Sequence, residues 1–334
     1  MAIKIGINGM GRIGRMILRS VLQNHKRDIL VKHINNKSNS DICANLLKND
    51  SVHGSFNARI KSNPNFLTIN NQKITYTQYA NIDDIKWKNY NVDYVFECTG
   101  KFNNKKQLLS HLKNGAKKVI VSAPCENADK TIVFGVNHKR LRKNDKIISA
   151  ASCTTNCLAP VVDVINKNFG IQNGFMTTIH AFTSDQRILD NSHKDPRRAR
   201  SASQSIIPTS TGASKAIGEI IPSLKGKLEG IAMRVPIPNV SLVEFIFNVK
   251  KKITDEKLNV SFSKASKKNL KNILKVSKEK LVSIDFNHND ASAIIDTTLT
   301  KVVGKNMGKI SAWYDNEWGF SNRMCDIAKY ISKI

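Results

Sequence analysis

The sequence has no long apolar segment. No run of apolar residues approaches the roughly 18 that a membrane-spanning helix needs, so we expect no membrane partner. The first residues alternate directly into a strand pattern, without the charged and apolar regions of a signal peptide. From these two absences we expect a cytoplasmic protein.

Cysteine is also scarce. Six cysteines in 334 residues, without dense or regular spacing, fit a reducing compartment better than a disulfide framework. Cys153 and Cys157 lie four residues apart, but no further cluster of Cys and His completes a tetrahedral set of ligands. We therefore expect no bound metal.

Acidic residues are few in comparison with basic ones. The chain carries 53 Lys and Arg against 26 Asp and Glu, a formal net charge of +27, which attracts polyanions or phosphorylated substrates. The lysines are scattered and mixed with asparagine, as on a solvated surface, so we expect nucleic acid to be at most a weak, secondary partner.

Internal repeats and low-complexity linkers are lacking, and 40% hydrophobic residues in this length suffice for two domains.

The first half of the chain alternates between strand patterns and helical patterns. Strand patterns lie at 3–7, 29–34, 93–98, 118–121, 131–136 and 147–150, with a short β excursion between 52 and 76. Such alternation favours an α/β fold built on a doubly wound parallel sheet.

A glycine-rich turn follows the first strand pattern. Gly9, Gly11 and Gly14 form a Gly-x-Gly-x-x-Gly pattern between that strand and a helix. In this setting the pattern predicts a dinucleotide-binding turn, because glycine lets the backbone approach a pyrophosphate at the helix N-terminus. Thr99 and Gly100 follow the strand at 93–98, at the edge of the sheet where such a cofactor lies.

The position that selects the cofactor departs from the usual pattern. An Asp or Glu is expected about 20 residues past the glycines, where it binds the ribose hydroxyls of NAD. Asn36 stands there instead and is followed by Lys37. Asn can hydrogen-bond a ribose 2′-phosphate and Lys37 can offset its charge, so the pair predicts tolerance of NADP as well as NAD.

Cys153 is the candidate nucleophile. A strand pattern at 146–150 precedes it, and apolar residues then recur at helical spacing as far as 169. Cys153 therefore lies near a helix N-terminus, where we expect the helix dipole to lower the pKa of its thiol and favour the thiolate. The neighbouring Ser152 and Thr154 suit the binding of anions.

The second half supplies a candidate base and candidate anion sites. His180 ends a strand pattern at 175–180, and a cysteine nucleophile needs a base that works near neutral pH. A basic, irregular stretch from 181 to 203 follows, and long ordered loops are often functional. A hydroxyl-rich turn at 208–213 and Arg234 in a strand pattern at 232–236 imply two separate anion subsites.

The remaining patterns are architectural. Strand patterns lie at 240–249, 294–303 and 309–314, and the lysine-rich segment 254–281 holds an amphipathic helix. The last helix, at 321–331, has one apolar face, which we expect to pack on the first domain.

Seven motifs taken together resemble the phosphorylating glyceraldehyde-3-phosphate dehydrogenase family over essentially the whole chain. They lie at 6–15, 152–160, 193–195, 197–200, 209–213, 233–236 and 313–319. The resemblance implies a Rossmann domain over 1–151, completed by a C-terminal helix at 318–334. It also implies a catalytic α+β domain over 152–317, with a mostly antiparallel sheet and an S-shaped loop over residues 181–203, and assembly into a homotetramer.

The resemblance also implies the chemistry. Cys153 would add to the aldehyde of D-glyceraldehyde 3-phosphate, and His180 would pair with the thiolate and accept the hydroxyl proton as hydride leaves. Inorganic phosphate would then cleave the thioester to give 1,3-bisphosphoglycerate. The further residues implied are Thr183 and Arg234 for the substrate phosphate, Ser152, Thr154, Arg198, Thr211 and Gly212 for inorganic phosphate, and Arg12, Ile13, Thr99, Ser122 and Asn316 for the cofactor.

Departures from the family pattern and two alternatives complete the prediction. Asn36 replaces the usual Asp, and Asn191 and Ser192 replace a Leu-Pro pair. Relatives that accept NADP resemble this chain in having a small polar residue at the position of the proline, here Ser192. We therefore expect use of NAD and NADP.

Erythrose-4-phosphate dehydrogenase is the competing enzyme, although the intact basic motif at 197–200 favours phosphorolysis. A basic nucleic-acid-binding protein is the alternative from a different class.

Overall fold

The chain divides into two units, seen here in a computed structural model that describes residues 2–334. Unit 1 contains the chain up to Ile132, His138–Ser152 and Ser321–Ile334, and unit 2 contains Val133–Asn137 and Cys153–Phe320. The chain thus enters unit 2 briefly at Val133–Asn137, and again from Cys153 to Phe320. Among residues 2–334, no helix combines the length and the apolar character that crossing a membrane would require.

Unit 1 is built on a nine-stranded sheet with the order β3-β4-β5-β2-β1-β6-β7-β9-β8. Its strands are β1 (Ile3–Asn8), β2 (Ile29–Asn35), β3 (Ile60–Asn63), β4 (Phe66–Ile69), β5 (Gln72–Thr77), β6 (Tyr94–Glu97), β7 (Lys118–Val121), β8 (Lys130–Thr131) and β9 (Ile147–Ser149). All pairs from β5 through β2 to β8 are parallel, whereas β3, β4 and β5 pair antiparallel. The predicted α/β class with a Rossmann-like sheet is confirmed.

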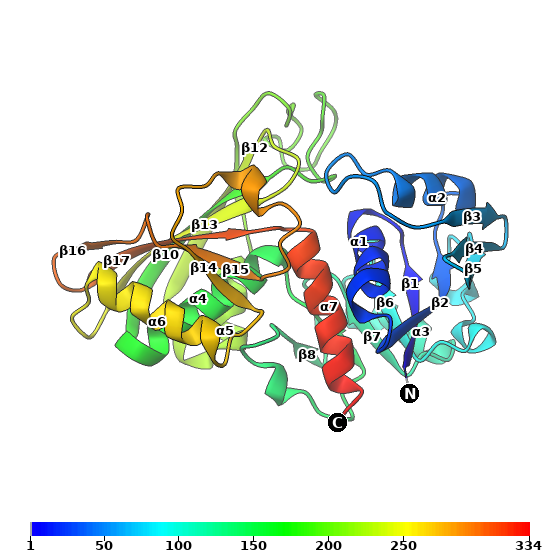
Figure 1. The fold of residues 1–334 in the computed structure, drawn as a ribbon, viewed down its shortest axis with the longest axis horizontal. Helices are drawn as coiled ribbons and strands as arrows, with labels where there is room; N and C mark the ends of the chain where they lie inside the picture. The colour runs from blue at the N-terminus through cyan, green and yellow to red at the C-terminus, as the bar shows by residue number, and fades with distance from the viewer. Residues whose placement is uncertain (1) are drawn as a thin grey trace. The chain divides into compact units, whose positions relative to one another are not determined.

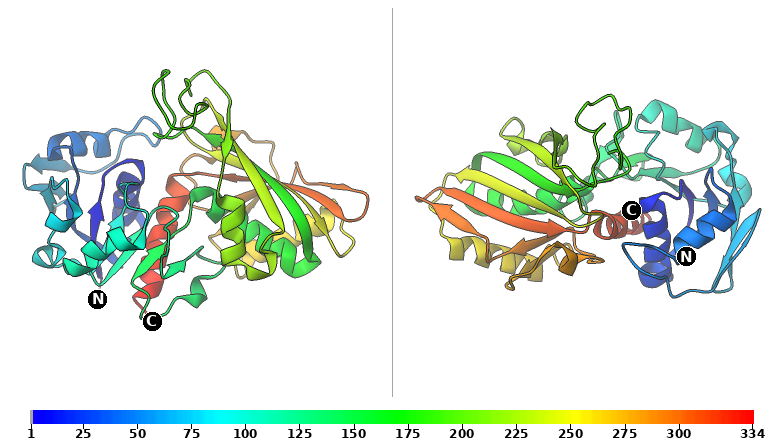
Figure 2. Two further views of the ribbon diagram at one scale, coloured as in Figure 1. Left: turned by 180° about the vertical axis from the view of Figure 1, so that it is seen from behind. Right: turned by 90° about the horizontal axis from the view of Figure 1, so that it is seen from above.

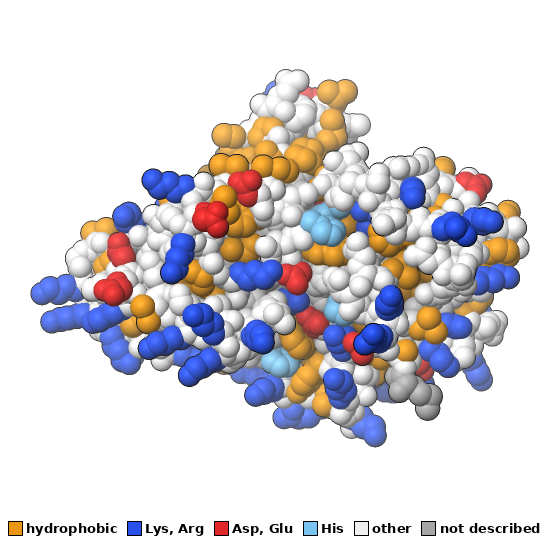
Figure 3. All heavy atoms as spheres, in the orientation of Figure 1, with side chains coloured by type: hydrophobic (Ala, Val, Ile, Leu, Met, Phe, Trp, Pro, Cys, Tyr) orange, Lys and Arg blue, Asp and Glu red, His pale blue; other side chains and the backbone are white. Residues whose placement is uncertain are grey.

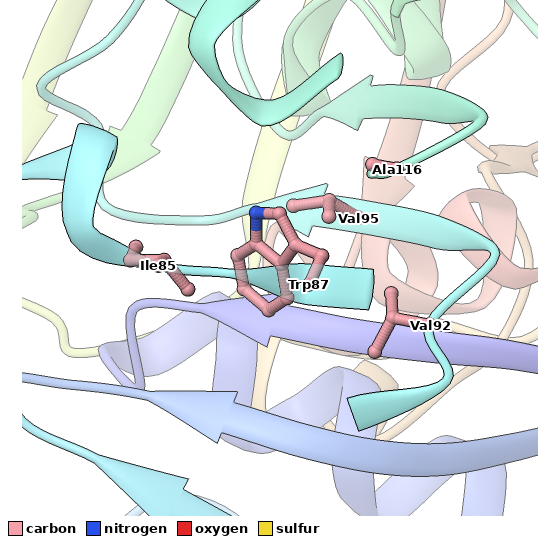
Figure 4. Close-up of a cluster of buried hydrophobic side chains, with 5 residues drawn as sticks. All are labelled: Ile85, Trp87, Val92, Val95 and Ala116. Carbon is pink, nitrogen blue, oxygen red and sulfur yellow. The ribbon is translucent and has the colours of Figure 1, made fainter. Parts of the chain in front are cut away.

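Helices accompany this sheet (Figure 1). They are α1 (Arg12–Ser20), α2 (Ser40–Lys48), α3 (Lys105–Lys113) and α7 (Trp318–Ile331), with short turns η1 (Val21–His25), η2 (Ile82–Asp84), η3 (Trp87–Tyr90) and η4 (His138–Arg140). Every residue of β6 and β7 is buried, as expected of parallel strands whose two faces are both covered. One of the apolar clusters centres on Trp87, with Ile85, Val92, Val95 and Ala116 around its indole (Figure 4).

The C-terminal helix α7 joins unit 1 from Ser321 onward. Its apolar residues Met324, Ile327, Ala328 and Ile331 are all buried. Within the unit, Ser20 Oγ of α1 donates to Asn322 Oδ1 at 2.8 Å, so the end of the chain lies against the helix that follows the first strand.

Unit 2 is built on a second sheet with the order β11-β12-β10-β13-β17-β15-β14, with β16 paired to β17. Its strands are β10 (Ile171–Ala181), β11 (Ile207–Ser210), β12 (Leu228–Val235), β13 (Ser241–Val249), β14 (Leu274–Ser277), β15 (Ala293–Asp296), β16 (Lys301–Val303) and β17 (Met307–Tyr314). The pairing is mostly antiparallel, and β10–β12 and β14–β15 are the parallel pairs.

Helices cover one face of this second sheet. They are α4 (Cys153–Phe169), α5 (Ala213–Ile220) and α6 (Asp255–Lys267), with short turns η5 (Pro222–Leu224) and η6 (Ser283–Phe286). Helix α4 contacts both α5 and α6 and packs on the central strands, and Figures 1 and 2 show the three helices on the same side of the sheet. The opposite face carries exposed apolar side chains, among them Phe175, Ile231 and Ile246.

Two strand predictions are wrong in their extent. The strand predicted at 131–136 is only β8, because the Asn137 side chain accepts a hydrogen bond from Val133 N–H and closes a turn there. The single strand predicted at 294–303 is two strands, β15 and β16. Asp296 Oδ1 accepts hydrogen bonds from the N–H and hydroxyl of Thr298, which ends β15 in a turn.

Candidate active site

A glycine turn opens the candidate cofactor site of unit 1. Gly9 has φ +95°, a conformation that side chains rarely adopt, and a Cβ on Gly14 would lie 2.1 Å from the carbonyl oxygen of Gly9. Only glycine fits both positions. Helix α1 starts directly afterwards, without an acidic residue in its first turn, so its free N–H groups favour an anion.

A pocket in unit 1 follows this turn. Five of the predicted cofactor residues line it, namely Gly9, Gly11, Asn36, Lys37 and Thr99, together with Asn8, Tyr79 and Cys98. A concave site at the carboxyl ends of β1, β2 and β6, beside a glycine turn, fits a dinucleotide. Arg12, Ile13, Gly14, Gly100 and Ser122 belong to unit 1 but are not among the lining residues, and Asn191, Ser192 and Asn316 belong to unit 2.

Asn36 is held by hydrogen bonds at both ends of its amide. Its Oδ1 accepts from Met10 N–H at 3.1 Å, and its Nδ2 donates to the Tyr76 hydroxyl at 3.2 Å. An Asp could keep the first bond and would lose the second, because a carboxylate has no N–H. The exposed Lys37 lines the same pocket. Beside Asn36 the pocket therefore carries a cation, and position 36, where the family usually has an Asp, carries no carboxylate.

Arg12, the first residue of α1, is paired with Asp50. Its guanidinium forms an ion pair with Asp50, at 2.5 Å and 3.1 Å between nitrogen and oxygen atoms. Burial alone would raise the pKa of Asp50, but the hydrogen bonds from Arg12, His53 N–H and Val52 N–H hold that pKa well below its usual range. The side chain of Arg12 is therefore tied to protein rather than directed to a ligand.

The sulfur and imidazole predicted for catalysis lie together in unit 2. Cys153 is the first residue of α4, His180 lies near the end of β10, and Sγ is 3.4 Å from Nε2. Strand β10 packs against α4, and this contact places the His180 imidazole beside the start of the helix. This distance lets one group donate a hydrogen bond to the other.

The charge state of this pair differs from the prediction. Burial raises the pKa of the Cys153 thiol above its ordinary value, and the charge of Arg234 and hydrogen bonds at Thr154 lower it by less. Burial and the charge of Arg234 lower the pKa of His180 to about 3. The predicted lowering of the thiol pKa is wrong, because removal from water outweighs the helix N-terminus. Burial therefore disfavours the charged form of both side chains.

Arg234 contacts the imidazole from the neighbouring strand. The register of β10 and β12 pairs His180 with Arg234, so both side chains lie on the same face of the sheet. Arg234 Nη1 lies 2.6 Å from His180 Nδ1 and donates to the carbonyl oxygen of Ala181 at 3.0 Å. The arginine predicted for the substrate phosphate is therefore next to the predicted base.

The other predicted anion residues lie in three places. Thr154 is in the first turn of α4, and Ser152 immediately precedes that helix. Thr183 donates from its N–H and hydroxyl to Gln186 Oε1. Arg198 donates to Thr209 Oγ1 and to Asp185. Thr211 Oγ1 accepts from Ala213 N–H, and Gly212 caps α5.

Two buried residues of these sites escaped sequence reasoning. The Tyr314 hydroxyl lies 2.9 Å from both Thr154 Oγ1 and Thr178 Oγ1, and so joins the first turn of α4 to β10. Glu97, at the end of β6, accepts hydrogen bonds from Asn8 Nδ2 and Thr99 N–H at 2.7 and 2.8 Å, and fixes two residues that line the pocket. Tyr314 lies inside a recognised motif, but nothing in the local sequence marks Glu97.

A dinucleotide pocket in one unit and a cysteine beside a histidine in the other are the features expected of a dinucleotide-dependent oxidoreductase. Two family models match the chain: the NAD binding domain of glyceraldehyde 3-phosphate dehydrogenase at residues 3–105, and the C-terminal domain of the same enzyme at residues 152–316. The chain belongs to the glyceraldehyde 3-phosphate dehydrogenase family.

Individual relatives agree with the family models over the whole chain. Glyceraldehyde-3-phosphate dehydrogenase from Cereibacter sphaeroides is 47% identical, with 100% of both chains covered. The enzyme from Geobacillus stearothermophilus is 48% identical, with 99% of both chains covered. Glyceraldehyde-3-phosphate dehydrogenase 2 from Bacillus subtilis is 45% identical, with 99% of this chain and 97% of the relative covered.

Proposed function

We propose that this chain oxidises D-glyceraldehyde 3-phosphate, in the presence of inorganic phosphate, to 1,3-bisphosphoglycerate. The observation that carries the proposal is the 3.4 Å approach of Cys153 Sγ and His180 Nε2 in a chain of this family. The full-length relatives named for this activity support the substrate.

The roles of the chain's own residues follow from their chemistry. Cys153, once deprotonated, adds to the aldehyde carbon, and His180 accepts the proton of the resulting hydroxyl. Arg234 and Thr183 hold the phosphate of the substrate. Ser152, Thr154, Thr211 and Gly212, with Arg198, hold the inorganic phosphate that cleaves the thioester.

The cofactor is held by the residues of the unit 1 pocket. Gly9, Gly11 and Thr99 offer backbone and hydroxyl groups, and Asn36 and Lys37 lie at the end expected to meet the adenosine ribose. When bound, NAD or NADP in its oxidised form supplies the acceptor for the hydride that leaves the thiohemiacetal on Cys153. NAD agrees with the matched domain, and NADP use is our further proposal.

Dependence on inorganic phosphate tests this function. We expect NADH formation from D-glyceraldehyde 3-phosphate only when inorganic phosphate is present, because phosphate releases the product from the sulfur. Erythrose-4-phosphate dehydrogenase activity, in which water releases the product, would proceed without it. Absorbance at the NADH band, measured with both aldehydes and with phosphate omitted, distinguishes the two reactions.

Dual cofactor use makes a prediction about Asn36. Replacing Asn36 by Asp is expected to lower kcat/KM for NADP by about 100-fold, because the carboxylate repels a ribose 2′-phosphate, and to leave kcat/KM for NAD equal or higher. Steady-state kinetics with each cofactor measure this. Asn39→Asp is the matched control, because it adds the same charge at the exposed N-cap of α2. In the wild type, NADP activity about a thousandfold below NAD would contradict dual use.

The bare face of the second sheet supports a homotetramer. Phe175 and Ile246 are paired across β10 and β13, and their side chains are 44% and 41% exposed on the face that carries no helix. Exposed apolar side chains that adjoin in this way favour contact with a second copy of the chain. On the face drawn in Figure 3, Lys and Arg are spread over much of the surface and do not gather in one patch, which does not favour a nucleic-acid site.

This assembly proposal is tested by light scattering after gel filtration. Phe175→Glu combined with Ile246→Glu is expected to lower the measured mass from that of a tetramer, because each copy would bring two charges into the interface and their burial opposes association. Val303→Glu changes an exposed apolar residue of β16 instead and should leave the mass unchanged. An unchanged mass in the double variant would place the interface elsewhere.

A further inference from the structure

Asn316 lies in a turn that its neighbours hold in place. The turn joins the end of β17 at Tyr314 to the start of α7 at Trp318. Asp315 Oδ1 accepts hydrogen bonds from Glu317 N–H and Trp318 N–H at 2.9 and 2.8 Å, which satisfies N–H groups at the start of the helix. The backbone of Asn316 is therefore fixed between strand and helix, and the residue is buried.

Ser241 contacts the side chain of Asn316 from the neighbouring strand. Antiparallel pairing of β13 with β17 places Ser241, the first residue of β13, opposite Tyr314. The Ser241 hydroxyl oxygen accepts a hydrogen bond from Ala181 N–H at 3.1 Å, and it lies 2.9 Å from Asn316 Oδ1. Ser241 thus joins Asn316 to the peptide group between His180 and Ala181.

The Ser241 hydroxyl fixes which end of the Asn316 amide faces it. A serine hydroxyl has one hydrogen, and Asn316 supplies the one acceptor that this hydrogen reaches among residues 2–334. Ser241 is 1% exposed, so a hydroxyl hydrogen without an acceptor would be costly there. If the amide were turned by half a rotation, its NH₂ group would face the hydroxyl oxygen and leave that hydrogen unpaired. The hydroxyl therefore donates to Oδ1, and Nδ2 points away from Ser241.

The amide nitrogen of Asn316 is a donor that a ligand can use. Among the residues that the structure describes, Nδ2 makes no hydrogen bond. The proposed reaction brings a nicotinamide ring to the carbon attached to Cys153 Sγ, and that sulfur lies 3.4 Å from His180 Nε2. The ring carries a carboxamide, whose oxygen accepts hydrogen bonds. An N–H donor that is joined through Ser241 to the peptide of His180 suits this oxygen.

The backbone before Ser241 is held in an unusual conformation. Val240 has φ +66°, in the left-handed region that β-branched residues rarely adopt. Its side chain is fully buried in an apolar cluster with Phe286, Ala291 and Ile294. Such a conformation persists only where the surrounding structure imposes it. The start of β13, and with it the Ser241 hydroxyl, is therefore fixed by the packing around it.

We propose that Ser241 is a positioning residue, whose hydroxyl orients the amide of Asn316 so that Nδ2 donates to the carboxamide oxygen of the bound nicotinamide cofactor. The serine acts through the amide, by holding Oδ1. The place of the nicotinamide ring rests on the proposed function, whereas cofactor binding can be measured without turnover.

Isothermal titration calorimetry of the full-length protein with NAD and with ADP-ribose, which lacks the nicotinamide ring, tests this role. Ser241→Ala is expected to weaken NAD binding about tenfold, because the amide loses its orientation, and to leave ADP-ribose binding within about twofold. Ser311→Ala is the matched control, because Ser311 is also buried and donates to Glu244 Oε1 at 3.2 Å across the same pair of strands. It should bind both ligands as the wild type does. Equal weakening of both ligands in Ser241→Ala, or none, overturns the proposal.

A double variant shows whether the serine acts through Asn316. Asn316→Ala removes the amide and is itself expected to weaken NAD binding about tenfold or more, since the donor is lost. Ser241→Ala added to it should then change NAD binding by less than about twofold, because no amide remains to be oriented. A further tenfold loss in the double variant would show that the serine acts independently of Asn316, and would contradict the proposal.

Ser241→Cys provides the conservative variant. Its thiol has nearly the size of the hydroxymethyl group and is a weak donor, so NAD binding should fall by less than in Ser241→Ala. It also gives the comparison of NAD with ADP-ribose if the alanine variant does not fold. Absence of D-glyceraldehyde 3-phosphate oxidation in a wild type that shows these binding differences would contradict the proposed function and leave the role of Ser241 in cofactor binding intact.

Discussion

Replacing Cys153 by Ser is expected to lower kcat for D-glyceraldehyde 3-phosphate oxidation by about 10⁴-fold or more, with little change in cofactor binding. The hydroxyl of serine stays protonated at neutral pH and is a poor nucleophile toward a carbonyl carbon. It would also form an ester in place of a thioester, and an ester transfers its acyl group to phosphate far less readily. Phosphate-dependent NADH formation, followed in parallel with cofactor titration, measures both quantities.

Cys157 supplies the matched control for this variant. It lies one helical turn further along α4, is fully buried, and its Sγ contacts the carbonyl oxygen of Ala312 at 3.7 Å. Cys157→Ser makes the same atomic change four residues away and should retain kcat within about threefold. Loss of activity in Cys157→Ser to the level of Cys153→Ser would show that the sulfur of Cys153 has no special role.

Replacing His180 by Gln is expected to lower kcat by about 10²- to 10⁴-fold, the usual contribution of a general base. The amide of glutamine can hydrogen-bond the sulfur but cannot accept a proton. Because the pKa of His180 is lowered to about 3, the imidazole is neutral from pH 5 upward, and the substitution should lower kcat over that whole pH range. The pH dependence of kcat for wild type and variant, with single-turnover hydride transfer, measures the effect.

One outcome would remove His180 from the mechanism. If the variant transfers hydride at the wild-type rate and is slowed only in release of the product, the imidazole is not the base for the thiohemiacetal hydroxyl. The control is Asn173→Asp, a change at an exposed position of the same strand, which should leave hydride transfer unchanged.

Much of the fold could be predicted because its signals are local. Each of these signals is contained in a short stretch of sequence. Examples are the apolar alternation of β1, the glycines required by the turn after it, and the helical spacing of apolar residues after Cys153. The family resemblance supplied the arrangement of the two sheets. The turn after Asp296 was missed because a side chain that caps a turn leaves the apolar pattern on either side unbroken.

The charge states at the site could not be predicted from the sequence. The helix N-terminus of Cys153 is a local feature that lowers a thiol pKa, whereas the burial that raises it depends on β10 and β17, which come much later in the chain. The contact between Arg234 and His180, which are 54 residues apart in the chain, depends likewise on the register of their two strands. Neither the burial of Cys153 nor the register of β10 and β12 can be predicted from the residues next to Cys153 and His180.

The parallel register of β10 and β12 also constrains how the length of such a chain can vary. Side chains alternate between the two faces of a strand, so one residue inserted between Leu228 and Arg234 would turn the guanidinium toward the helix-free face of the sheet. Residues inserted in the loop between Ala181 and Ile207 would leave that pairing intact. An insertion in that loop would therefore spare the pairing of His180 with Arg234, whereas an insertion within either strand would break it.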